Sequence, residues 1–244
     1  MKPLFRVRPW ACLVAFSILA ASCSKRTPSS SEDQGICVSR IFPQVSDHAV
    51  SGANLDSIYR LFALNNLSTA DLQFQSWQTY TTNNVNAGAY SGYQEQVQAV
   101  QFFNGLPVFN ETEYFTFDAG SYQPGGMNDG YTGPVPAADT TGHQTPGGLR
   151  AAFLQKLSQS YIAGGPLHSR PFVPSPSTYV NACLDVSLGY LDAGLIPGNA
   201  AGFESALVKV WRVTPTRSSS ITYYPLVFVE DDNGFAWGVP SFHP

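Results

Sequence analysis

Apolar residues at helical spacing are the first clear pattern in the chain, over residues 54–66. They recur every three or four positions and share one face: Leu55, Ile58, Tyr59 and Phe62. Asn54 is a suitable N-cap, and the pair Asn65-Asn66 is a plausible stop. The spacing predicts one amphipathic helix here.

Alternating apolar and polar residues then predict three strands. Residues 71–82 alternate first, and 83–92 form a turn-rich gap. The runs 96–103 and 106–118 flank Asn104-Gly105. Asn-Gly between such runs is the strongest short hairpin signal, because both residues accept positive φ in a type I′ turn. In the return strand Phe115 and Phe117 alternate with polar neighbours.

Residues 120–148 interrupt this pattern. The stretch holds eight Gly and four Pro, and Val135 is nearly its only aliphatic residue. Loops of this length without secondary structure are usually linkers or binding loops. We therefore expect 121–144 to be a linker or loop with one exposed, functional face.

The second half repeats the order of helix and strands. A helix begins at Thr145-Pro146, with Thr as its cap and Pro in its first turn, and ends at Gly164-Gly165-Pro166. The cleanest alternation in the chain follows at 178–192, where even-numbered apolar residues point one way. Further strands are expected at 206–214, 221–230 and 235–239, with a turn at 231–234.

These elements predict an α+β fold in two halves. Each half is an antiparallel sheet of three to four strands packed against one helix. The halves span residues 50–120 and 145–244, and residues 23–49 form a flexible tether and N-terminal segment. Repetition of helix then strands is a weak internal duplication.

The first 22 residues have the parts of a secretory signal. Lys2, Arg6 and Arg8 precede a short apolar run, 11–21, that is too short to span a bilayer. The segment Leu19-Ala20-Ala21-Ser22-Cys23 resembles a bacterial lipobox, after which Cys23 would be acylated. Cleavage by ordinary signal peptidase at the same bond would instead give a secreted protein. We expect a lipoprotein of the cell envelope, and Ser24 resembles a signal for the outer membrane.

The cysteine count agrees with lipidation. The mature chain would hold Cys23, Cys37 and Cys183, and acylation of the first leaves an even pair. Cys37 and Cys183 then form either a disulfide or two separate thiols, with Cys183 buried as a small apolar residue. Sequence leaves both readings open.

Charge and motifs exclude several functions. Three of the 13 basic residues leave with the signal, so the net charge of the mature chain is 10 minus 17, or −7. This negative charge argues against nucleic-acid binding. No nucleophile, metal or phosphate-loop motif is present, so we expect no enzyme, cofactor or metal. The histidines are scattered: His48, His143, His168 and His243. The acidic run 230–232 is interpreted as a solvated turn rather than a calcium site.

Two stretches resemble known propeptide domains. Gln101-Phe102-Phe103-Asn104-Gly105-Leu106-Pro107-Val108-Phe109, running on to residues 117–120, is similar to the hairpin of the FTP segment in thermolysin-type propeptides. Residues 208–214, 224–229 and 232–234 are similar to the end of a PepSY domain. Asn110 departs from the glycine usual in the family. The resemblance implies a cystatin/PepSY-like fold and an inhibitory or protein-binding role.

Two functions follow as hypotheses. The first is a non-enzymatic module that restrains or escorts an exported protein, such as a peptidase. Its partner would contact the hairpin residues Asn104, Gly105, Leu106, Pro107, Val108 and Phe109, unless Val108 and Phe109 fill this protein's own core. The second is a glycan-binding or structural lipoprotein that uses the aromatic-rich surface and the loop 120–148.

Overall fold

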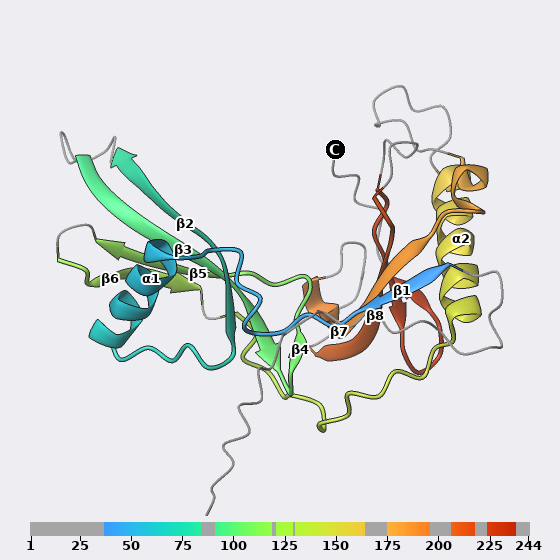
Figure 1. Ribbon diagram of the computed structural model, residues 1–244, viewed down its shortest axis with the longest axis horizontal. Helices are drawn as coiled ribbons and strands as arrows, with labels where there is room; N and C mark the ends of the chain where they lie inside the picture. Colours follow the sequence, from blue (N-terminus) through green and yellow to red (C-terminus); the bar gives the residue numbers. More distant parts are fainter. Residues whose placement is uncertain are drawn as a thin grey trace, which may run out of the picture.

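The computed structural model describes residues 37–83, 91–118, 121–128, 130–163, 175–195, 206–217 and 224–237. Within these ranges the chain forms two antiparallel-rich sheets and two α-helices, arranged as two bodies (Figure 1). The predicted α+β class is confirmed. The strand number is higher than predicted, because each sheet has five strands rather than three or four.

The first body is a meander sheet covered by α1 (Ala53–Leu64). Its strands are β2 (Leu72–Asn83), β3 (Ser91–Phe103), β5 (Glu113–Asp118) and β6 (Pro124–Asn128), with β4 (Leu106–Pro107) paired to β3. The core between helix and sheet is aromatic-rich and includes Phe62, Phe74 and Phe117, which are fully buried. The N-cap prediction is wrong: Gly52, at φ 59°, precedes the helix, and Asn54 lies inside it.

The second body is a sheet in the order β1-β7-β8-β9-β10. Its strands are β1 (Val38–Ile41), β7 (Leu184–Asp192), β8 (Leu207–Pro215), β9 (Val227–Glu230) and β10 (Ala236–Trp237). Helix α2 (Pro146–Ala163) packs on it through Leu149, Phe153 and Leu157. Thr145 caps this helix as predicted, since its Oγ1 accepts a hydrogen bond from the Gly148 N–H at 3.1 Å.

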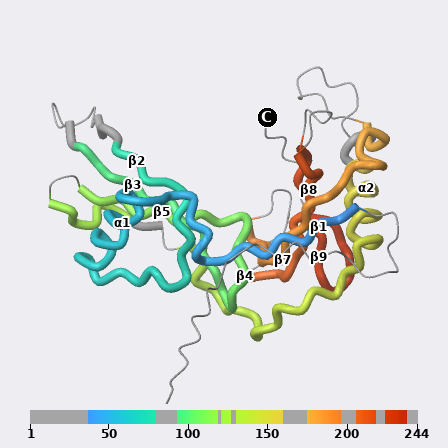
Figure 2. The backbone as a smooth tube through the Cα atoms, in the orientation of Figure 1, coloured from blue at the N-terminus to red at the C-terminus, as the bar shows by residue number. Residues whose placement is uncertain are grey.

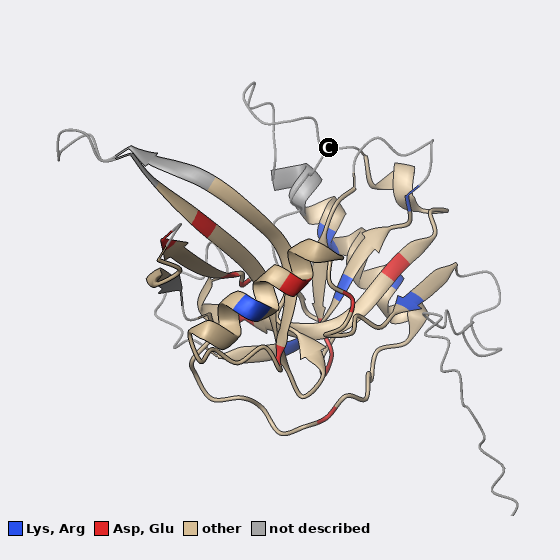
Figure 3. Ribbon diagram, turned by 60° about the vertical axis from the view of Figure 1, so that its left-hand side comes forward, with Lys and Arg blue, Asp and Glu red and all other residues tan. Residues whose placement is uncertain are grey.

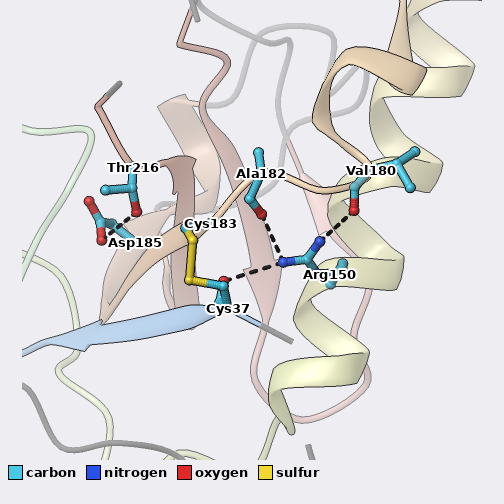
Figure 4. The surroundings of a disulfide bond; sticks show 7 residues. All are labelled: Cys37, Arg150, Val180, Ala182, Cys183, Asp185 and Thr216. Atoms are coloured by element: carbon cyan, nitrogen blue, oxygen red, sulfur yellow. Dashed lines mark hydrogen bonds between the residues drawn. A yellow bond between two sulfur atoms is a disulfide. The ribbon is translucent and has the colours of Figure 1, made fainter. Parts of the chain in front are cut away.

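The described part of the N-terminal segment begins with a strand of the second sheet, β1. β1 pairs parallel with β7, so this sheet is not wholly antiparallel. Figure 2 shows the chain starting beside β7 and then crossing to the first body. A disulfide joins Cys37 to Cys183 at the start of this pairing, and Arg150 of α2 donates to the carbonyls of Cys37, Val180 and Ala182 (Figure 4).

The predicted strand 178–192 begins later than its alternation suggested. A 3-10 helix occupies Pro176–Tyr179, Val180 is 49% exposed, and β7 starts at Leu184. β7 is buried on both faces, including Ser187, which lies on the face opposite the even-numbered apolar residues. The reason is tertiary: α2 covers one face, and the ring of Phe109 lies so close to Gly189 that a Cβ there would be 2.5 Å away.

The segment 121–144 is not a free linker. It contributes β6 to the first sheet and then continues along the second body. Tyr131 is buried in the second core at 3% exposure. Gly142 lies against the indole of Trp211, where no Cβ would fit. Local composition signalled an irregular chain correctly, but not its packing.

The predicted hairpin turn is confirmed, but its return strand is broken. Asn104 and Gly105 have φ of 53° and 78°, and β3 pairs with β4 across them. Beyond Pro107 the chain leaves the first sheet, and Val108 forms a parallel bridge with Tyr190 of β7. Pairing with β3 resumes only at Glu113. This detour joins the two bodies.

Candidate functional site

A pocket of about 180 Å³ lies between α1 and the covered face of the first sheet. Its lining combines aromatic, aliphatic, charged and hydroxyl side chains: Ser57, Arg60, Leu61, Leu64, Trp77, Glu95 and Tyr122. The four helical residues stand at i, i+3, i+4 and i+7, so they form one stripe of α1. That stripe lies next to the core-facing residues Ile58 and Phe62.

Trp77 and Glu95 enter the pocket from the sheet. Trp77 is opposite Val97, a fully buried residue, and Glu95 is two residues before Val97 on the same face. The Trp77 indole nitrogen is buried and has no hydrogen-bond partner among the described residues. A buried N–H without an acceptor costs about 1–3 kcal/mol.

Tyr122 closes one end of the pocket. Its backbone has φ of 55°, uncommon for a non-glycine residue. Two hydrogen bonds hold it there: its N–H donates to the Asp118 carbonyl at 2.8 Å, and Asn65 Nδ2 donates to its carbonyl at 2.9 Å. The tyrosine is therefore positioned by both the helix and the sheet, although its side chain is 45% exposed.

The pocket holds two charges of opposite sign that do not pair with each other. In the described ranges neither Arg60 nor Glu95 forms a salt bridge within 4.0 Å. Both therefore have hydrogen-bonding capacity to offer a ligand. Sequence reasoning missed this site, because its residues come from α1, β2, β3 and the segment after β5.

Strand β2 forms an edge of the same sheet and is 12 residues long. It contains no charged residue, and its partner β3 contains only Glu95, as the sparse colouring of Figure 3 reflects. Natural edge strands are usually short, or protected by charges, proline or a bulge. β2 has a bulge between Phe74 and Ser76 but no charge or proline.

Only the beginning of the β2 edge is covered by described residues. The Phe74 N–H donates to His48 Nδ1 at 3.1 Å, and the Phe74 carbonyl accepts from the Ala49 N–H at 2.8 Å. After the bulge the alternation of an antiparallel ladder turns the backbone groups of Trp77 and Thr79 away from β3. Within the described ranges no residue pairs with these groups, so another extended segment can pair with them.

Asp231 lies at the centre of a polar network in the second body, which corrects its prediction as a solvated turn residue. Its side chain is fully buried. One carboxylate oxygen accepts from Trp211 Nε1 at 2.6 Å and from the His143 N–H at 2.8 Å. The other lies 3.1 Å from Lys209 Nζ and 3.0 Å from His143 Nδ1.

The network keeps its acids ionised. Burial raises the pKa of Asp231, but hydrogen bonds from the His143 N–H, Trp211 and Lys209 outweigh it, so this pKa lies below its ordinary value. The hydrogen bond from Lys209, at 2.6 Å, holds the pKa of Asp139 at about 2. Burial lowers the pKa of Lys209, but its hydrogen bonds to Asp139 and Asp231 have the larger combined effect. The pKa of Lys209 therefore lies above its ordinary value.

His143, Asp231 and Asp232 bring possible ligand atoms within 4.8 Å of one another. The Lys209 ammonium already neutralises Asp231 at this point. The arrangement therefore serves the fold: it ties the segment 139–144 to β8 and to the turn after β9.

A pair of carboxyl groups, Glu111 and Asp192, lies where the two bodies meet. Asn110 mimics a backbone partner, since its Nδ2 donates to the Asp192 carbonyl and its Oδ1 accepts from the Asp192 N–H, both at 2.8 Å. Glu111 is hydrogen-bonded to the Asp192 carboxyl. Burial first, then the nearby Asp192 charge and this hydrogen bond, raise the pKa of Glu111.

The structure places the sequence-predicted site residues as follows. Asn104 and Gly105 are exposed in the turn, but Leu106, Pro107 and Val108 are buried, with Val108 at 0% exposure in the second core. The half-buried Phe109 packs on Gly189 and stacks near Phe228 at 5.8 Å. The hairpin's apolar side chains therefore fill this protein's own core, the alternative that sequence left open.

Other predicted positions lie partly outside the described residues. Cys23, His168 and His243 are among those outside. His48 is a structural residue here. Its Nδ1 accepts from the Phe74 N–H, and its Nε2 lies 2.9 Å from the Tyr59 hydroxyl.

Along the described ranges, no helix combines the length and hydropathy needed to cross a bilayer. No protein-family model matches the chain, and a search of curated proteins finds no match.

Proposed function

We propose that this chain is a non-enzymatic lipoprotein of the cell envelope that binds an extended segment of an exported protein, such as a peptidase. The bound segment adds a strand to the open edge of β2. The observation that carries this proposal is the 12-residue uncharged edge, covered among described residues only near Phe74. Strand addition obtains affinity from main-chain hydrogen bonds and specificity from neighbouring side chains.

The binding surface differs from the one that the motif first suggested. The Asn104–Phe109 hairpin supports the resemblance to FTP segments, and its Asn-Gly turn has the required geometry. Its large apolar residues are already used between the two bodies. The partner surface in this proposal is therefore β2, while the cystatin/PepSY-like relationship remains part of the proposal.

Proline substitution on β2 tests strand addition. Thr79→Pro removes an outward-facing N–H and inserts a ring where the partner strand would lie, whereas Thr79→Ala keeps the backbone intact. Affinity capture from envelope extracts with the full mature chain should recover one stoichiometric exported protein. Capture should persist with Thr79→Ala and fall at least tenfold with Thr79→Pro, while both variants keep the wild-type melting temperature within a few degrees. Equal capture by the two variants contradicts the proposal.

The anchor is tested separately. Metabolic labelling with a palmitate analogue should label the wild-type protein and not Cys23→Ala. Absence of label in the wild type would remove the lipid anchor and leave a secreted protein, without affecting the strand-addition proposal.

A further inference from the structure

We propose that the pocket between α1 and the first sheet binds one ring of a neutral saccharide. The pocket uses the side chain of Trp77, whereas strand addition uses backbone groups of β2, so the inference does not rest on the proposed strand addition. The argument comes from four properties of the pocket: its charges, its other polar groups, its apolar surfaces and its preformed shape.

The two charges disfavour a ligand with a single net charge. A carboxylate or phosphate attracted by Arg60 would be repelled by Glu95, and an ammonium group attracted by Glu95 would be repelled by Arg60. Both side chains remain strong hydrogen-bonding groups for a neutral ligand, because charge-assisted hydrogen bonds are stronger than neutral ones. A ligand without net charge that both donates and accepts hydrogen bonds suits this pair of side chains. Hydroxyl groups do both.

The polar part of the lining offers both donors and acceptors. A sugar hydroxyl can donate to the Glu95 carboxylate and accept from the Arg60 guanidinium. Ser57, half-buried on the facing side of α1, offers a hydroxyl that can do both.

The apolar part of the lining fits the C–H face of a sugar ring. Trp77 and Tyr122 present aromatic rings, whose faces carry partial negative charge and attract polarised C–H groups. Leu61 and Leu64 complete the apolar side. A volume of about 180 Å³ corresponds to roughly six water molecules at ~30 Å³ each. This is room for one ring rather than for a chain of sugars.

The pocket is also preformed. Asn65 holds the Tyr122 backbone from the helix, and Asp118 holds it from the sheet. Trp77 packs against the first core. A ligand that enters a preformed site does not have to order these side chains, which favours binding of a small molecule.

Ligand-detected NMR on the full mature chain tests the proposal. The probes are glucose, galactose, mannose and N-acetylglucosamine, with glucuronate and glucosamine as charged comparisons. At least one neutral sugar should bind more tightly than either charged sugar. Trp77→Ala should weaken binding at least tenfold, because it removes the aromatic face, and Trp77→Phe, which keeps an aromatic ring, should weaken it less than Trp77→Ala does. Tyr93→Ala changes a 62% exposed residue of β3 outside the pocket and should leave affinity unchanged.

Three results would overturn the inference. They are the absence of binding by all four neutral sugars, tighter binding of a charged sugar than of any neutral one, and equal affinity in Trp77→Ala and the wild type. Near-ultraviolet circular dichroism of each variant checks that the fold is retained. Glu95→Gln, which keeps size and hydrogen bonding but removes charge, gives a second variant and should weaken binding about threefold or more.

Discussion

At the scale of single residues, the fold depends on buried carboxylates that are satisfied by distant parts of the chain. Asp231 accepts from Trp211 and from the His143 backbone, which lie 20 and 88 residues away in sequence. Its position in an acidic turn looked solvent-exposed, because nothing local indicates which carboxylate a remote segment will cover. Burial converts an ordinary turn residue into a structural one.

Replacement of Asp231 tests this network. Asp231→Asn removes the charge that faces Lys209 and His143 and should lower the free energy of unfolding by about 1.5–3 kcal/mol, because the buried charge-assisted hydrogen bonds are lost and Lys209 keeps only Asp139 as its charged partner among the described residues. Asp232→Asn is the matched control, since that side chain is 77% exposed and should change stability by less than about 0.5 kcal/mol. Denaturant unfolding measures both. Equal effects of the two substitutions would contradict the network.

The same network sets the behaviour of the fold in acid. The pKa values of Asp139 and Asp231 are lower in the folded than in the unfolded chain, so their contribution is complete above the unfolded pKa of about 4. This contribution to stability is lost as the pH falls through the pKa values of the folded protein, and that pKa is about 2 for Asp139. Unfolding measured from pH 5 to 2 should therefore show a smaller loss of stability in Asp139→Asn than in the wild type.

Glu111 should show the opposite pH dependence. Its pKa is raised in the folded protein, so the protonated form is stabilising, and this contribution is lost as pH rises from the unfolded value through the folded one. Glu111→Gln, whose amide can still donate to Asp192, should be more stable than the wild type at pH 8, with little difference at pH 4. Asp47→Asn, on the exposed surface, serves as control. A pH-independent difference would argue against a shared proton.

At the scale of elements, most signals confined to a few neighbouring residues predicted structure correctly, with the Asn54 cap as an exception. The Asn104-Gly105 turn, the alternation of β5 and the Thr145 cap each depend on local backbone geometry. β1 was missed because its partner β7 lies 146 residues later, and no periodicity in four residues identifies a parallel edge strand. The pocket was missed for the same reason, since Arg60, Trp77 and Tyr122 meet only in three dimensions.

The disulfide stabilises the pairing of β1 with the distant strand β7. Cys37 and Cys183 close a loop with a sequence separation of 146. The chain-entropy model gives an upper limit of about 5 kcal/mol for a loop of this size, and typical values are about 2–4 kcal/mol. Reduction should therefore lower the free energy of unfolding by at least about 2 kcal/mol. A variant carrying both Cys37→Ala and Cys183→Ala should not respond to reductant; the same response in wild type and variant would contradict the role of this bond.

At the scale of the whole molecule, two bodies are joined along a continuous set of contacts. The N-terminal segment starts in the second sheet and leads into the first body, and Val108 returns to β7 from the first sheet. Asn110 and Glu111 add hydrogen bonds to Asp192 at the same place. These contacts use the hairpin internally, and they leave the long edge of β2 on the outside of the first body, available for an added strand (Figure 1).

Photo-crosslinking in intact cells tests the central claim most directly. A photoreactive amino acid at position 79, on the open edge of β2, is compared with one at position 208, on the central strand β8 of the second sheet. The account predicts a single adduct with an exported protein from position 79, mapped to an extended segment of that protein, and none from position 208. An absence of adducts at position 79, or the same adduct from both positions, would contradict strand addition at β2.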